Sequence, residues 1–138
     1  MSLTACDLIR KTILDQLVIT IGEYEESGSP IKGPFDSHEK IEAAITDLDN
    51  AGLSDYYYEA ESDARHCYTH ETPIEPDSCG HYESKSVATE IDGQWVGWTY
   101  WYGGGKHGEP SLMEWLGDAY FLDCCEEMRV VQVFTKID

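Results

Sequence analysis

The dipeptide Asp92-Gly93 and the two runs beside it constrain this chain more than any other feature. Asp-Gly is strongly favoured in two-residue hairpin turns, because both turn positions take positive φ. The flanking runs, 84–91 and 94–101, are rich in β-branched and aromatic residues, and the second holds three of the four tryptophans. They predict an antiparallel hairpin in which the two-residue turn sets Val87 opposite Trp98.

The predicted register gives the hairpin two unlike faces. One is bulky and typical of a core, and it includes Val87, Val96 and Trp98. The other carries Trp95 and Trp101, about 20 Å apart at a strand rise of ~3.3 Å per residue, on either side of small residues. Such a face suits the stacking of a base, a sugar or a partner's side chain, but more often a face of this kind is where a helix packs.

A glycine loop follows the hairpin directly and contains Gly103, Gly104, Gly105, Lys106 and His107. Glycines let backbone N–H groups approach an anion, and a lysine adds positive charge. The loop lacks the spaced glycines and the Ser or Thr of a P-loop. The alternative is a connection that needs positive φ at several positions. Lys106 and His107 are the residues to test first for a catalytic role.

The first part of the chain has helical spacing. In residues 3–18 the apolar side chains lie three to four positions apart, with charged side chains between them. The run 17–21 would either extend this helix or begin a short strand, and its β-branched content favours the strand. A loop rich in proline and glycine follows, up to residue 34.

Two capping signals predict further helices. Asp36 and Glu39 have the form of a capping box, with Ser37 as a rival cap, and an apolar stripe follows them. Ser111 and Glu114 form a second capping box. The apolar stripe after it comprises Leu112, Trp115, Leu116, Ala119 and Leu122.

Two more segments favour strands. Residues 55–62 alternate in a way that predicts a half-buried strand, and the valine-rich segment 128–137 predicts a strand in the middle of the sheet. The order of elements indicates an α+β fold, with an antiparallel or mixed sheet of four to five strands and about three helices packed mainly on one face. The whole chain, residues 1–138, is expected to form a single domain.

Two cysteines and three of the five histidines lie within residues 66–81. Zinc prefers four tetrahedral nitrogen and sulfur ligands. The predicted set is Cys67, His70, Cys79 and His81, with His66 as a substitute for any one of them. Four protein ligands would make a structural site, and three would leave a position for water and hydrolysis. The competing interpretation is an irregular loop with solvated histidines and with cysteines packed as small apolar groups.

The composition excludes some classes of partner. With 27 acidic and nine basic residues the net charge is −18, which argues against direct binding to nucleic acid or to an anionic membrane. Such a charge steers a protein toward basic partners, and carboxylates also imitate phosphates. No run is apolar enough for a membrane span, and the odd cysteine count is unlike a secreted disulfide framework. A cytoplasmic protein is expected.

One run of the sequence resembles small uncharacterised proteins of phages and other mobile elements. It reads Gly97-Trp98-Thr99-Tyr100-Trp101-Tyr102 and continues as Gly103-Gly104-Gly105-Lys106-His107-Gly108-Glu109-Pro110. The resemblance covers about 14 residues and implies no activity. It favours binding to a host factor, because small acidic proteins of mobile elements are similar in charge to DNA mimics.

Three hypotheses follow. The leading one is a non-enzymatic, acidic regulatory domain that binds a protein partner, such as a DNA-binding protein, through the aromatic face, its carboxylates, or both. The second is a small zinc-dependent or anion-binding enzyme that uses the glycine loop. The third is a structural subunit whose tryptophan face forms a homodimer.

Overall fold

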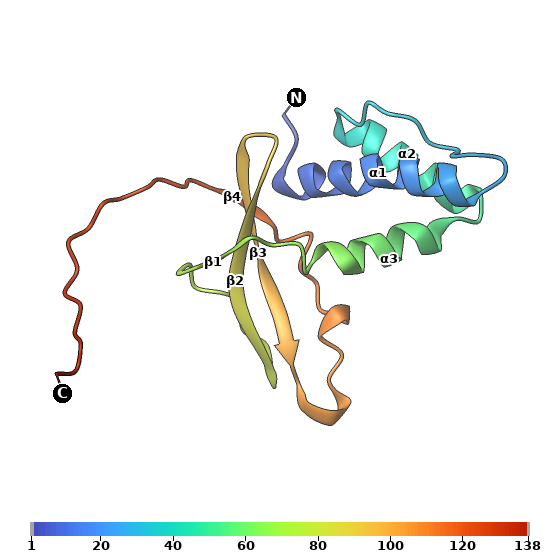
Figure 1. The fold of residues 1–138 in the computed structure, drawn as a ribbon. Helices are drawn as coiled ribbons and strands as arrows, with labels where there is room; N and C mark the ends of the chain where they lie inside the picture. The colour runs from blue at the N-terminus through green and yellow to red at the C-terminus, as the bar shows by residue number, and fades with distance from the viewer. Residues whose placement is uncertain (1, 138) are drawn as a thin grey trace.

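The computed structural model describes residues 2–137, except for the side chain of His107, and Figure 1 shows a layer of helices beside a sheet. In chain order the elements are α1 (Ala5–Tyr24), α2 (His38–Asn50), α3 (Ser54–Ala64), β1 (His70–Thr72), β2 (Tyr82–Ile91), β3 (Gln94–Gly103), the 3₁₀ turns η1 (Gly105–His107) and η2 (Pro110–Leu112), and β4 (Tyr120–Leu122). The helices all lie on one side of the sheet, which confirms the α+β prediction. Within the described residues, none of the helices has the length and apolar character that crossing a membrane requires.

The hairpin β2–β3 has the predicted register. Asp92-Gly93 forms its turn with φ of 50° and 79°, and Val87 pairs with Trp98. Val87, Val96 and Trp98 are each at most 2% exposed and face the helices. The hairpin therefore supplies the sheet's half of the hydrophobic core.

The sheet has the order β1-β2-β3-β4, and every neighbouring pair is antiparallel. The two outer strands are short. Strand β1 pairs only with Ser86–Ala88, and β4 pairs only with Trp95–Gly97. The ring of Tyr120 lies against Gly97, where a Cβ atom would come within 2.8 Å of it. Much of the long hairpin's two outer edges is left without a strand neighbour.

Helix α1 begins where Thr4 and Asp7 form a capping box, and it continues to Tyr24. The strand expected at 17–21 is wrong, because this segment is helical. Leu17 and Ile21 lie one helical turn apart and are buried at 3% and 0% exposure. They extend the stripe of the preceding turns, so burial outweighs the weak β preference of the branched residues.

Helix α2 confirms the second predicted helix, and the structure decides between the two proposed caps. The Ser37 hydroxyl accepts a hydrogen bond from the Lys40 amide, whereas Asp36 forms an ion pair with the Lys40 ammonium. The helix is followed by Gly52 at φ 75°, in the left-handed conformation expected after a helix C-terminus.

The strand predicted at 55–62 is wrong, because these residues belong to helix α3. Tyr57, Ala60 and Ala64 recur at helical spacing, and Tyr57 is 3% exposed against the core. The segment also contains good helix formers, alanine and glutamate, between its tyrosines. Over these few residues the pattern fits both the two-residue period of a strand and the 3.6-residue period of a helix, and packing against the core favours the helix.

The third helix predicted after Ser111 is also wrong. The segment forms the short turn η2, an irregular stretch that buries Trp115 and Leu116, and then strand β4. The Glu114 carboxylate accepts a hydrogen bond from the Gly117 amide at 2.6 Å instead of closing a capping box. Gly117 would have stood inside the expected helix, where glycine costs roughly 1 kcal/mol relative to alanine.

The strand predicted at 128–137 is not part of the sheet. Residues 123–137 have no regular secondary structure, and Figure 1 shows them leading away from the helices. Their large apolar side chains are exposed. The exposed fractions are 103% for Met128, 103% for Val130, 70% for Val131, 82% for Val133, 89% for Phe134 and 91% for Ile137. The segment has the alternating sequence pattern of a strand, but it does not pair with the sheet of its own chain.

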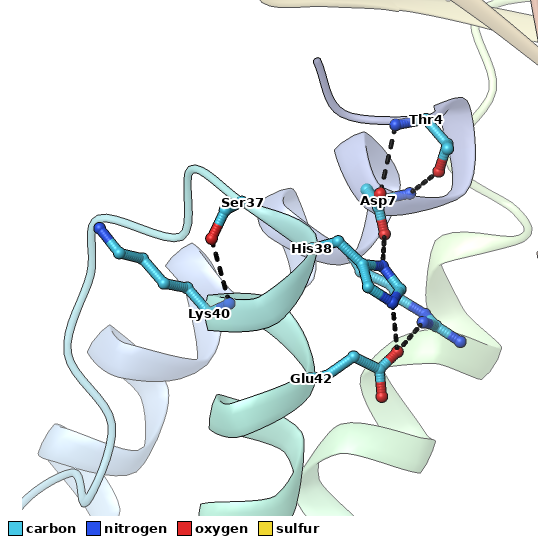
Figure 2. A network of polar contacts seen from close by, with 7 residues as sticks. Thr4, Asp7, Ser37, His38, Lys40 and Glu42 are labelled. Atoms are coloured by element: carbon cyan, nitrogen blue, oxygen red, sulfur yellow. Dashed lines mark hydrogen bonds and ion pairs between the residues drawn. The ribbon is translucent and has the colours of Figure 1, made fainter. Parts of the chain in front are cut away.

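A polar network joins the first turns of α1 and α2 (Figure 2). The buried carboxylate of Asp7 lies 2.9 Å from His38 Nδ1 and also accepts from the Thr4 backbone amide. Burial raises the pKa of Asp7, but the hydrogen bonds from His38 and Thr4 outweigh it, so the net pKa is lowered. The same hydrogen bond to Asp7 raises the pKa of His38.

The signs of these two shifts define the pH range in which the pair stabilises the fold. The contribution of Asp7, whose pKa is lowered, is present above its unfolded pKa of about 3.9 and is lost as the pH falls through the folded value. The contribution of His38, whose pKa is raised, is complete below about pH 6.5 and is lost as the pH rises through the folded value. Both groups are charged between the lowered and the raised pKa.

We expect Asp7→Asn to lower the pKa of His38 toward its ordinary value, because the substitution removes the main cause of the shift. Histidine side-chain NMR over a pH titration measures this directly. Asp15→Asn is the matched control, since it removes the same charge from α1 at a residue paired with Lys11. Equal decreases in the two variants would show that the overall negative charge, and not the contact, sets the pKa of His38.

Candidate functional site

The structure does not bring the predicted zinc ligands together. The Cys67 thiol contacts the Asp63 carbonyl, the ring of His70 packs edge-on against Trp95, and the ring of His81 stacks on Tyr82. The remaining two residues of the set also lie apart: Cys79 is an exposed free thiol, and His66 Nδ1 lies 2.9 Å from the Tyr100 hydroxyl. Among the described residues, no three His, Cys, Asp or Glu side chains are grouped so as to hold a metal ion.

The two tryptophans of the predicted aromatic face are in different environments. Trp101 is 4% exposed, and its indole N–H donates to the Glu114 carbonyl at 3.2 Å. Trp95 is half-buried beside His70. The small residues between them are covered, because the preceding loop crosses this face: the Asp77 amide donates to the Thr99 hydroxyl. The expected open floor between the tryptophans is therefore closed.

The glycine loop adopts the left-handed conformations that its composition indicates. Gly103, Gly104 and Gly105 have φ of 73°, 88° and 69°. A Cβ atom on Gly104 would lie 2.7 Å from the ring of Tyr82, so the loop packs closely against the start of β2. Lys106 is exposed, and the side chain of His107 lies outside the described part of the structure. These contacts account for the glycines through the fold alone.

A second aromatic cluster surrounds Lys85. Its ammonium lies 5.3–5.7 Å from the ring centres of Tyr68, Tyr100 and Tyr102 and 2.6 Å from a Glu71 carboxylate oxygen. The hydrogen bond to Glu71 raises the pKa of Lys85, which keeps it charged. This cluster resembles a cation-binding cage whose place is already taken by the chain's own lysine.

A groove of about 830 Å³ lies between α1, α3 and the turn end of the hairpin. Its volume falls within the usual range for binding sites, roughly 300–1,000 Å³. Ile13 on α1, Ile91 on β2 and Trp98 on β3 contribute apolar walls. Ala60 and Ala64, one turn apart on α3, line it with methyl groups and so leave it open.

Charge and an open strand edge distinguish this groove. Glu59 and Asp63 lie along it, Glu90 borders it at the edge of β2, and the described residues that line it include no lysine or arginine. Strand β2 is unpaired beyond Ala88, whose carbonyl accepts from the Thr69 amide. Glu90, two residues further on, therefore directs its backbone N–H and C=O toward the same open edge. An extended peptide in the groove would meet apolar walls, carboxylates and free backbone hydrogen-bonding groups.

The sequence supplied only part of this site. The inward stripe predicted for residues 3–18 includes Ile9, Ile13 and Leu17 of the α1 wall, but not the part of the wall formed by Thr20 and Tyr24. The α3 wall was missed because Ala60 was assigned to a strand, although its four-residue spacing to Ala64 was a helical signal.

Comparisons with protein-family models, curated proteins and solved structures found no match for this chain.

Proposed function

We propose that this protein is a non-enzymatic binding domain that takes an extended, apolar and basic segment of a partner protein into the groove between α1, α3 and the hairpin. The observation that carries the proposal is the combination of apolar walls with an acidic border. Apolar side chains of the partner would gain burial at Ile13 and Trp98, while its lysines or arginines would face Glu59 and Asp63.

At the turn end of the groove, the outward backbone N–H and C=O of Glu90 offer two hydrogen bonds to an extended segment. Peptides that add a strand to a sheet edge gain affinity from backbone hydrogen bonds, and side-chain pockets supply specificity. The net charge of −18 would steer a basic protein toward this surface, which favours a DNA-binding protein as the partner class. The five free cysteines support action in a reducing compartment such as the cytoplasm.

A direct test uses labelled ten-residue peptides that alternate valine with lysine or valine with glutamate, with binding measured by fluorescence anisotropy. We expect the lysine peptide to bind, and its affinity to fall steeply between 50 and 500 mM salt, because screening weakens charge pairing. Ala60→Trp should reduce that affinity about tenfold or more, since the indole fills the groove. Ala51→Trp is the matched control, at an exposed position outside the groove.

A surface variant keeps the test informative if Ala60→Trp does not fold. Glu59→Lys with Asp63→Lys reverses two exposed charges beside the groove, and Glu39→Lys with Asp47→Lys makes the same change on α2. Only the first pair should abolish binding of the lysine peptide. Equal loss in both double variants, or equal binding of the valine-glutamate peptide, would remove the groove from the proposal.

A further inference from the structure

The C-terminal segment 128–137 has the chemistry that the groove would select. It contains Arg129 and Lys136 and no acidic residue, in a chain whose net charge is −18. Its valines alternate along it, and Val133 is 82% exposed. An exposed, β-prone apolar segment is an aggregation hazard unless a surface covers it.

The dimensions of segment and groove agree. The groove follows α1 from Ile9 to Tyr24, which is about 22 Å at a helical rise of 1.5 Å per residue. An extended strand covers that length with about seven residues. Arg129 and Lys136 are seven positions apart, about 23 Å, so they would lie near the two ends of the groove, with Arg129 on the face of Val133 and Lys136 on the opposite face.

The geometry favours delivery of the segment by another molecule. The segment follows β4, at one edge of the sheet, and Figure 1 shows it leading away from its own helices. The groove lies under those helices and borders the open edge of β2, on the side of the sheet where β1 lies. Exchange of a terminal segment between two identical chains is a common route to a symmetric dimer.

We propose that residues 128–137 of a second copy of this chain occupy the groove along α1, and that two copies exchange these segments reciprocally. This inference rests on the proposed function and names a partner for the same groove. A basic partner protein then competes with the second copy, so partner binding and self-association are mutually exclusive at each groove.

The test measures the mass of the full chain by sedimentation in 0.05 M and in 0.3 M salt, because salt weakens both the repulsion between acidic copies and the attraction of Arg129 and Lys136 to the groove. Wild type should sediment as a dimer of the 15.6 kDa chain. Val133→Asp should weaken the dimer roughly 10- to 100-fold, the equivalent of losing one buried valine and burying a charge. Gln132→Asp is the matched control, because it adds the same charge at the adjacent position, whose side chain points to the opposite face of the strand.

Mixing two defective variants tests reciprocity. Val133→Asp keeps a free groove, and Ala60→Trp keeps a competent segment, so neither should dimerise alone while the mixture forms a dimer with one exchanged segment. The proposal is overturned if wild type is monomeric or if its dimer survives Val133→Asp. It is also overturned if Gln132→Asp weakens the dimer as much as Val133→Asp does.

A peptide experiment separates this inference from the proposed function. A labelled peptide with the sequence of residues 128–137 is titrated into the full-length Val133→Asp variant. Binding of the peptide, with a monomeric wild type, retains the groove as a peptide site and rejects the exchange. Absence of binding by both this peptide and the valine-lysine peptide rejects the groove itself.

Discussion

Replacing Trp98 with alanine should lower the free energy of unfolding by about 3–5 kcal/mol, the usual cost of removing a large aromatic side chain from a core. Trp98 is 2% exposed, its ring centre lies 5.4 Å from that of Trp115, and its indole N–H donates to the Arg65 carbonyl. Urea unfolding at one fixed protein concentration measures the loss. Trp98 also lines the groove, so peptide affinity should fall in the same variant.

Trp95→Ala is the control for Trp98→Ala, because it removes the same side chain from the same strand. Trp95 is only half-buried, against His70, and its loss should cost less than half as much. Equal losses for the two tryptophans would contradict the assignment of Trp98 to the centre of the core.

Replacing Arg65 with leucine should cost about 2–3 kcal/mol, because it leaves a buried carbonyl without its charged donor. Arg65 is 7% exposed and donates to the Trp101 carbonyl at 2.9 Å. Its guanidinium also lies 5.0 Å from the centre of the Tyr100 ring. The residue therefore fixes the end of α3 to β3, and urea unfolding again provides the measurement.

Arg65→Lys should recover only part of this loss, since an ammonium cannot reproduce the planar stacking of a guanidinium on Tyr100. Lys40→Leu is the control, because it also replaces a cation with leucine. Lys40 pairs with Asp36 at the surface, and such pairs contribute about 0–1 kcal/mol. If Arg65→Leu were as stable as Lys40→Leu, the connection between α3 and β3 would have no structural importance.

The elements that could be predicted were those specified by local chemistry. Asp92-Gly93 determined the turn, and a two-residue turn leaves one register for the whole hairpin. Two candidate caps, Asp36 and its rival Ser37, next to an apolar stripe indicated α2, and Ser37 is the cap that forms. In both places the signal depends on a few neighbouring residues, so tertiary packing had little to change.

The segments that were predicted wrongly were those where packing decides. Over residues 55–62 the pattern fits an alternating strand as well as a helical stripe, and packing of α3 against α1 and α2 favours the helix. Trp115 and Leu116 are apolar because they are buried in the core, where Trp115 packs against Trp98, and not because they belong to a helix. The candidate groove was beyond sequence reasoning because it combines residues from α1, α3 and both strands of the hairpin.

The contact between Asp7 and His38 has a consequence for the length of the connection between their helices. It joins the first turns of α1 and α2, so the two helices run parallel and not antiparallel. The connecting residues must therefore travel back along all of α1, which has 20 residues and spans about 30 Å. The 13 residues between Tyr24 and His38 reach about 43–47 Å when fully extended. Deleting more than about four of them would stretch the connection taut and pull His38 away from its carboxylate, so this loop tolerates insertion far better than shortening.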